Sequence, residues 1–447
     1  MSTVLVAASE SAVGPALALI LGAGMLAQWL AWRTQTPSII ALLLAGLLLG
    51  PVTGIVDPDD LLGGTLFPLV SLAVALILFE GGLDLPPREL RSTGTVVRRL
   101  ITFGATVTFL VAWYGAREIF GISNQAAIVL GAVLVVTGPT VVGPILRFVR
   151  PVGSTGPILR AEGVLIDPIG ATAALVAFEI ILINTPNEAA LRVVAVVLLT
   201  IVAGAGIGVA AAVVIDTALQ RFLIPDQLAV PATFAFVIAS FVAANEVQEE
   251  SGLVAVTVMG MYLARRESST IREVAAFNEN LRTLLISVLF ILLAARIEPD
   301  ALRDVLVPAL AFLALLVFVA RPLAVLVSTV RTSLSWRERA FLMAMAPRGI
   351  VAAAVSAIFA IRLEEEGIPD SAKIVPIVFL VIIGTIVVYG FLAGRPPHRR
   401  SPCGCARPCD RAGIARCQDV AGRHGPVQRH AGNRPRTHSA PDQRARR

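Results

Sequence analysis

The chain has 447 residues, of which 56% are hydrophobic and only 15% are charged, and its mean hydropathy is +0.80. These values exclude an ordinary water-soluble protein and predict a polytopic membrane protein. The formal charge of +6 does not point to a nucleic-acid partner, because the segment from Arg395 onward holds a surplus of about ten positive charges and leaves the rest of the chain slightly acidic.

Thirteen stretches of the sequence are apolar enough to cross a bilayer. The first follows no cleavable signal pattern, so we expect it to stay in the protein. Residues 1–394 are therefore predicted to form one all-α transmembrane domain. The thirteen stretches lie near residues 13–32, 37–56, 66–83, 100–120, 125–146, 157–183, 191–215, 227–244, 252–264, 281–297, 305–328, 338–361 and 373–394.

The connecting loops predict the orientation in the cell membrane. Loops after odd-numbered stretches hold about 16 basic residues and those after even-numbered stretches about six, which places the odd loops in the cytoplasm. The N-terminus is then outside and the C-terminus inside. Segment 395–447 is rich in Arg, Pro, Cys and His and has no aromatic residue, so we expect a disordered cytoplasmic tail and an aberrant end, such as a shifted reading frame.

Several kinds of chemistry are excluded by the distribution of reactive residues. All four cysteines and all four histidines lie after Arg395. The body of the chain therefore has no ligand set for haem or zinc, no thiol nucleophile and no Ser-His-Asp triad. There is no Walker sequence for an ATP-driven pump, and no paired-carboxylate spacing for a membrane-embedded enzyme. We expect neither a catalytic residue nor a cofactor.

Ionisable residues inside the predicted spans are functional candidates, because each costs from a few to more than ten kcal/mol unless it is paired or hydrated. Asp167 follows a helix start at Ser154 to Pro157 by about ten residues, which places it roughly 15 Å along the axis and near the midplane. Its sequence neighbours offer no partner, so its carboxylate can hold a proton or a cation. The plainer alternative is an acid that faces a hydrated crevice or is paired for folding.

Glu162 precedes Asp167 by five residues, so the two side chains point about 140° apart on a helix. We therefore expect Glu162 to pair with an arginine on another span. Arg348 and Arg321 are the deep candidates, and Arg348 is favoured because Arg321 lies where it can snorkel to the cytoplasmic surface. Glu80, near the end of the third stretch, either supplies an oxygen to a cation or reaches water.

Two predicted spans contain helix-breaking residues. Thr137-Gly138-Pro139 interrupts the fifth stretch, and Pro347-Arg348-Gly349 interrupts the twelfth. Proline removes a helix donor, so carbonyl groups are freed at both places. Breaks at matching places in two halves of a secondary transporter point to its ion site, although ordinary proline kinks remain the alternative.

These features resemble the monovalent cation:proton antiporters, specifically the prokaryotic sodium/proton antiporters that are related to eukaryotic sodium/hydrogen exchangers. The resemblance covers residues from about 10 to 394. It implies a thirteen-span inverted-repeat fold, usually a homodimer, in which a core domain with two crossed discontinuous helices moves against a dimerisation domain. It rests on the motifs Phe79 to Leu83, Thr137 to Thr140, Glu162 to Pro168 and Ala346 to Gly349.

The resemblance also implies roles for individual residues. Asp167 matches the ion-binding aspartate, Thr137 would offer an oxygen, and Glu80 is similar to an acid near the ion in some members. Glu162 and Arg348 match the intramembrane ion pair of the family. The residues of the discontinuous helices are Gly138, Pro139, Pro347 and Gly349.

The chain departs from the family pattern beside these residues. Ile166 stands where Asn is common, Gly138 where Asp is common, and Gly163 where some members have a small polar residue. We expect an electroneutral antiporter for pH homeostasis that exchanges H⁺ for Na⁺, with K⁺ as the rival cation. A channel or uniporter for anions is the alternative transport class, but it would need more basic residues at mid-membrane positions than Arg348.

Overall fold

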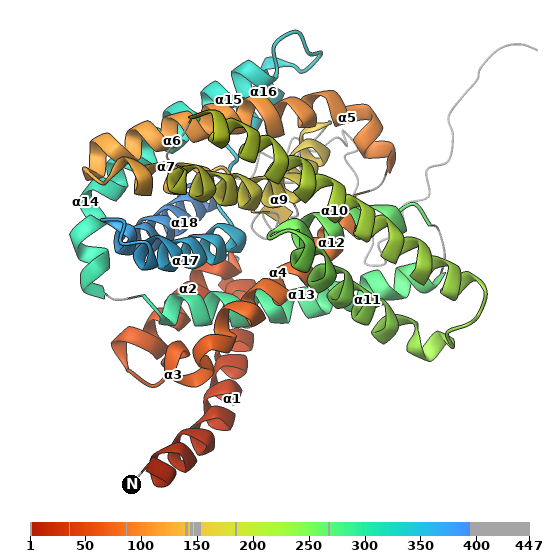
Figure 1. The fold of residues 1–447 in the computed structure, drawn as a ribbon, viewed down its shortest axis with the longest axis horizontal. Coiled ribbons are helices and arrows are strands. Elements are labelled where there is room, and N and C mark those ends of the chain that lie inside the picture. Colours follow the sequence, from red (N-terminus) through yellow and green to blue (C-terminus); the bar gives the residue numbers. More distant parts are fainter. Residues whose placement is uncertain are drawn as a thin grey trace, which may run out of the picture. The chain divides into compact units, whose positions relative to one another are not determined.

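The computed structural model describes residues 2–34, 36–85, 87–138, 142–143, 146, 153–183, 186–266, 269–297 and 299–393. The described residues form helices joined by short connections (Figure 1). In chain order the α-helices are α1 (Ser2–Thr34), α2 (Ser38–Leu47), α3 (Pro58–Leu62), α4 (Leu66–Leu83), α5 (Pro87–Arg99), α6 (Ala105–Phe120), α7 (Asn124–Val133), α9 (Thr155–Leu182), α10 (Pro186–Gln220), α11 (Asp226–Val247), α12 (Ser251–Leu263), α13 (Ser269–Ala295), α14 (Pro299–Leu315), α15 (Arg321–Ser328), α16 (Trp336–Met343), α17 (Ile350–Glu365) and α18 (Ser371–Ala393).

Short turns of other helical types connect some of these elements. A 3₁₀ turn, η2 (Gly63–Thr65), joins α3 to α4. Wider π-helical turns are η1 (Leu48–Val52), η3 (Leu100–Gly104) and η4 (Leu316–Ala320). The last two continue without interruption into α6 and α15, so each shifts the helical register within one long element.

Nine helices in the described part of the chain are long and apolar enough to cross a membrane, which agrees with a polytopic membrane protein. They are Val13–Thr34, Pro58–Leu83, Thr93–Phe120, Thr155–Leu182, Leu191–Gln220, Asp226–Val247, Thr270–Ala295, Leu302–Ser328 and Ser371–Tyr389. Each overlaps one of the thirteen predicted stretches. The other four stretches correspond to three shorter apolar helices, Ser38–Val52, Asn124–Val133 and Ser251–Leu263, and to the interrupted pair α16 and α17.

Helix ends follow local chemistry that the sequence carries. Asp57 caps α3 by accepting hydrogen bonds from the backbone N–H groups of Asp59 and Asp60. Ser335 and Glu338 form a capping box at the start of α16. The first turn of α9 begins at Thr155, as the sequence predicts, and the helix then runs for 28 residues through Pro168.

Two groups of helices pack closely. One consists of α7, α9, α17 and α18, and the other of α4, α10, α11 and α12 (Figure 1). Small residues permit the closest contacts, since a Cβ added at Gly208 of α10 would lie 2.3 Å from the carbonyl oxygen of Ala255 in α12. Contacts of α9 with α10 and α12 connect the two groups. The helix that carries Asp167 therefore lies where the two groups meet.

The predicted tail, residues 395–447, lies outside the described residues, as does Pro139 of the first helix break.

Candidate ion-binding site

The two interrupted elements meet in the structure. Helix α7 ends at Val133, and residues 134–138 continue without helical structure. Residues 344–349 separate α16 from α17 in the same way. The backbone N–H of Gly138 donates to the carbonyl oxygen of Pro347 at 3.2 Å, so the two breaks touch. Gly349 has an extended backbone and precedes the first turn of α17.

Arg348 forms hydrogen bonds with the non-helical segment that follows α7. Its side chain is 4% exposed, and Nη1 donates to the carbonyl oxygens of Val135 at 3.1 Å and Val136 at 2.8 Å. Its backbone N–H donates to Oγ1 of Thr385 in α18. A cation at a helix C-terminus stabilises the carbonyl groups that have no helical partner there. Arg348 therefore holds the end of α7 against α17 and α18.

The predicted ion pair of Glu162 with Arg348 is wrong. Glu162 instead accepts two hydrogen bonds from Arg321: one from Nη1 to Oε1, and one from Nη2 to Oε2 at 2.9 Å. Arg321 is 6% exposed, and its Nε also donates to the carbonyl oxygen of Leu342. Two physical reasons account for the exchange of partners. First, turn η4 changes the helical register directly before Arg321, so this side chain points inward and does not snorkel. Second, the guanidinium of Arg348 already donates to carbonyl groups in the interruption after α7.

Asp167 is fully buried, and within the described residues neither of its carboxylate oxygens has a hydrogen-bond partner. It lies on α9, five residues after Glu162 and directly before Pro168. A carboxylate that is buried without a partner is unstable as a free charge. A bound proton or a bound cation would each remove this cost at Asp167.

Thr137 is brought to the same region by a close helix contact. A Cβ added at Gly170, one turn after Asp167, would lie 2.2 Å from a side-chain carbon of Val136, so α9 presses directly on the break. Thr137 is the next residue in the chain. Its hydroxyl is buried and has no hydrogen-bond partner among the described residues. The structure thus packs the turn of α9 that follows Asp167 against Val136, directly before Thr137 and Gly138.

Glu80 has a partner that the sequence analysis did not name. It is buried in α4, and its Oε1 lies 2.9 Å from Nη1 of Arg282 in α13. The next residue, Gly81, contacts Val164 of α9, which places Glu80 close to the helix of Asp167 but paired with its own cation. The signal was available in the sequence, because Arg282 falls inside the predicted stretch 281–297.

The charges of the site therefore divide into paired and unpaired groups. Glu162 is matched by Arg321, Glu80 is matched by Arg282, and the guanidinium of Arg348 lies on carbonyl dipoles. Among the described residues, Asp167 has no cationic partner. One carboxylate at a crossing of two broken backbone segments is suited to hold either one proton or one monovalent cation at a time.

The chain is similar to several known proteins. A sequence model of the family described as sodium/hydrogen exchanger, transmembrane, matches residues 16–396. A protein named K(+)/H(+) antiporter NhaP, from Alkalimonas amylolytica, is 27% identical over 375 residues, which are 80% of this chain and 62% of that relative. The chain thus spans less than two thirds of that relative's length.

A second relative is named Na(+)/H(+) antiporter 1, from Methanocaldococcus jannaschii. It is 24% identical over 389 residues, which are 84% of this chain and 89% of the relative. The solved structure of the sodium proton antiporter MjNhaP1 from the same organism at pH 8 has a TM-score of 0.74 at 20% identity, and it covers 86% of this chain and 99% of its own. The two folds are therefore alike.

Proposed function

The chain belongs to the transmembrane sodium/hydrogen exchanger family, and we propose that it is a secondary antiporter that exchanges a proton for Na⁺ or K⁺. Membership in this family makes it a transporter and not an enzyme. The observation that carries the proposal is the buried carboxylate of Asp167, which has no hydrogen-bond partner within the described part of the chain. It lies on α9, which packs against α7 and α17, the helices next to the two interruptions.

Competition at Asp167 accounts for antiport without ATP. The carboxylate binds a proton or a cation but not both, and either one removes the cost of a buried free charge. A site that opens alternately to the two sides of the membrane then carries one ion in each direction. Thr137 is placed to add a hydroxyl oxygen to the cation, and carbonyl groups near the break can add others.

Sodium is the favoured cation, with potassium as the rival. Ile166 and Gly138 have no side-chain oxygen, so fewer fixed ligands surround Asp167 than an Asn or an Asp at these places would provide. Of the two relatives described above, one is named for K⁺ and the other for Na⁺. Either cation is compatible with a single carboxylate.

The larger architecture is part of the same proposal. In this proposal, the nine long apolar helices of the described residues, three shorter ones and the interrupted pair α16 and α17 would make up thirteen crossings of an inverted-repeat fold. We further propose a homodimer in the cell membrane. Its N-terminus would be outside and its C-terminus in the cytoplasm, because basic residues collect in the odd-numbered loops.

The test is proton flux in proteoliposomes that contain a pH-sensitive dye. Addition of Na⁺ or K⁺ should collapse an imposed pH gradient for the parent chain, and Asp167→Asn should abolish the response. Glu179→Gln is the matched control, because Glu179 lies on the same helix but forms an ion pair with Arg192 near the exposed end. It should retain flux within about tenfold, which is 1.4 kcal/mol of barrier.

Glu80→Gln is a second comparison in the same assay. Because Arg282 already neutralises Glu80, this variant should keep its cation response. Loss of flux equal to that of Asp167→Asn would instead make Glu80 a ligand of the ion. Equal flux in the parent and in Asp167→Asn would refute the proposal for Asp167.

A further inference from the structure

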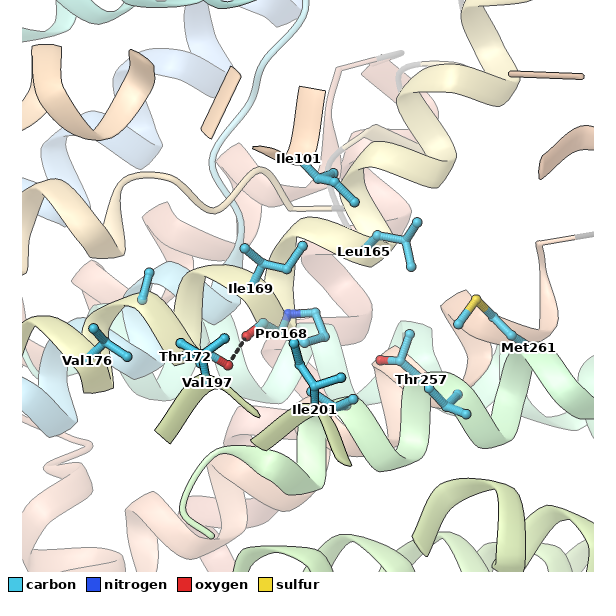
Figure 2. Close-up of a pocket in the computed structure, with 13 residues that line it drawn as sticks. Ile101, Leu165, Pro168, Ile169, Thr172, Val176, Val197, Ile201, Thr257 and Met261 are labelled. Carbon is cyan, nitrogen blue, oxygen red and sulfur yellow. Dashed lines mark hydrogen bonds between the residues drawn. The ribbon is translucent and has the colours of Figure 1, made fainter. Parts of the chain in front are cut away.

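A cavity of about 500 Å³ lies between α9, α10, α12 and η3 (Figure 2). Its wall on α9 is one continuous stripe with helical spacing: Leu165, Pro168, Ile169, Thr172, Ala173 and Val176. At 100° per residue, Asp167 points away from this stripe by roughly 170°. The cavity is therefore separate from the candidate ion site and lies on the opposite side of the same helix.

The walls of this cavity offer no free polar group among the described residues that line it. Its two threonines direct their hydroxyl groups to their own helices. Thr172 donates to the carbonyl oxygen of Pro168 at 2.8 Å (Figure 2). Thr257 donates to the carbonyl oxygen of Leu253 at 2.7 Å. A stable buried water needs about two to four polar partners. The cavity therefore disfavours water and suits an apolar ligand.

The cavity is continuous with the surface that faces lipid. Ile201 of α10 lines the cavity and is also 52% exposed. Its neighbours Leu198 and Val202 are 56% and 66% exposed, on a helix that is long and apolar enough to cross the membrane. Hydrocarbon chains are the medium around such a surface, so they are the apolar groups with direct access to the cavity.

We propose that this cavity binds one acyl chain of a membrane phospholipid, inserted between α9 on one side and α10 and α12 on the other. The dry walls, the volume and the continuity with the lipid-facing surface of α10 all favour this occupant. The binding site stands on these observations alone, without the proposed transport function.

Photolabelling tests the site directly. The full chain is reconstituted in phosphatidylcholine bilayers in which some acyl chains carry a diazirine, and labelled residues are located by mass spectrometry after irradiation. We expect adducts on the cavity stripe of α9, at Ile169 or Val176, in addition to adducts on the exposed face of α10. Labels on α10 with none on the α9 stripe would overturn the proposal, because the cavity would then exclude lipid.

Variants that fill the cavity sharpen the test. Ala173→Phe from α9 and Val197→Phe from α10 should each reduce labelling of the α9 stripe at least about fivefold, because an added ring occupies the space of the chain. Val202→Phe, on the exposed face outside the cavity, is the control and should leave that labelling unchanged. Two filling variants from different helices guard against misfolding of either one. Undiminished α9 labelling in both filled variants would overturn the proposal.

An acyl chain in this cavity would also contact α9 on the side opposite to Asp167. An effect of the acyl chain on transport therefore follows, and it rests on the proposed function. If α9 moves against α10 and α12 during exchange, filling the cavity with a fixed ring should change the rate of cation-driven proton flux at least about twofold relative to Val202→Phe. Equal rates would overturn the coupling but not the site. Because labelling needs no ion gradient, inactivity of the parent chain would count against the proposed function only.

Discussion

At the scale of single residues, the distribution of arginines decides the electrostatics of the site. Two deep arginines compete for one glutamate, and the structure gives Glu162 to Arg321 while Arg348 binds the carbonyl groups of Val135 and Val136. A guanidinium has five donors in a fixed fork, so it suits both a carboxylate and a pair of carbonyls. Position along the chain alone does not distinguish these two uses.

The pair of Glu162 with Arg321 yields the first prediction at this scale. Arg321→Met should lower the free energy of unfolding by roughly 3–5 kcal/mol, because it leaves the buried Glu162 charge without its partner. Adding Glu162→Gln to the same chain should recover part of this loss. Thermal unfolding in detergent measures both. Arg303→Met, which breaks an exposed pair with Asp300, is the control and should have little effect.

The outcome that contradicts this pairing is specific. If Glu162→Gln rescues Arg348→Met more strongly than it rescues Arg321→Met, the glutamate belongs to Arg348 after all, and the geometry of this region must be different.

Glu250 provides a prediction of pH dependence. It lies in the connection between α11 and α12, beside Glu249 and Arg362, with a left-handed backbone. Burial raises the pKa of Glu250 to about 7, the Arg362 charge opposes this shift, and the Glu249 charge adds to it. The folded protein therefore holds a proton that the unfolded chain releases at its ordinary pKa of 4.5, so stability falls as pH rises from about 4.5 to 7 and then levels off.

Glu250→Gln removes this titration. The variant should unfold at a higher temperature than the parent at pH 8, by on the order of a few degrees, and the difference should shrink at pH 5. Thermal unfolding at the two pH values is the measurement. A difference that is larger at pH 5 than at pH 8 would mean that Glu250 is ionised more easily in the folded protein than in the unfolded chain.

At the scale of helices, the prolines predicted the breaks and the small residues set the contacts. The motif around Pro347 placed the interruption between α16 and α17 correctly, and the end of α7 lies before Gly138 as expected. Local sequence patterns could not show that the two interruptions touch, because the backbone hydrogen bond from Gly138 to Pro347 joins residues that are far apart in the chain. They also could not show η4, whose wider turn directs Arg321 inward.

The contact of Gly170 with Val136 carries the prediction at this scale. Gly170→Ala should destabilise the fold by about 1–3 kcal/mol and lower exchange, because the new methyl group would push α9 away from the break near Thr137. Gly206→Ala in α10 is the matched control, since nothing lies within 4 Å of the added Cβ. The control should be neutral or slightly stabilising, because alanine favours a helix over glycine by about 1 kcal/mol. Thermal unfolding and proton flux measure both variants.

Equal stability and equal proton flux in the two glycine variants would mean that α9 does not pack against the non-helical segment after α7. In that case Thr137 would lose its argued place beside Asp167, and the site would consist of the carboxylate and other oxygens.

At the scale of the whole molecule, composition predicted more than any motif. The fraction of apolar residues and the spacing of charges indicated an all-helical membrane protein, and the described helices agree. The sequence also singled out Asp167, because a lone carboxylate among apolar neighbours stands out in a membrane span. It did not give the partner of Glu80, since pairing between α4 and α13 depends on how distant helices pack.

The charge balance of the described membrane domain leads to the last prediction. Glu80 and Glu162 each have a cation of their own, and Arg348 donates to carbonyl groups. Under the proposed function, Asp167 is therefore the carboxylate that changes its partner during exchange. The carboxylate carries the same net charge with a bound proton as with a bound monovalent cation. Exchange should therefore be electroneutral, and its rate in proteoliposomes should not respond to an imposed membrane potential of either sign.

The same single site predicts a bell-shaped dependence of exchange on pH. At low pH the proton excludes the cation from Asp167, and at high pH no proton is bound to be carried back. Raising the cation concentration should move the acidic limb of the bell to lower pH, because the two ions compete for one carboxylate.

A rate that follows the membrane potential would contradict electroneutral exchange, and it would require a second charge to move with Asp167. Glu80 would then be the first candidate for this second charge, because the next residue, Gly81, contacts Val164 of α9. Arg282→Gln, which removes the cation partner of Glu80, would test it.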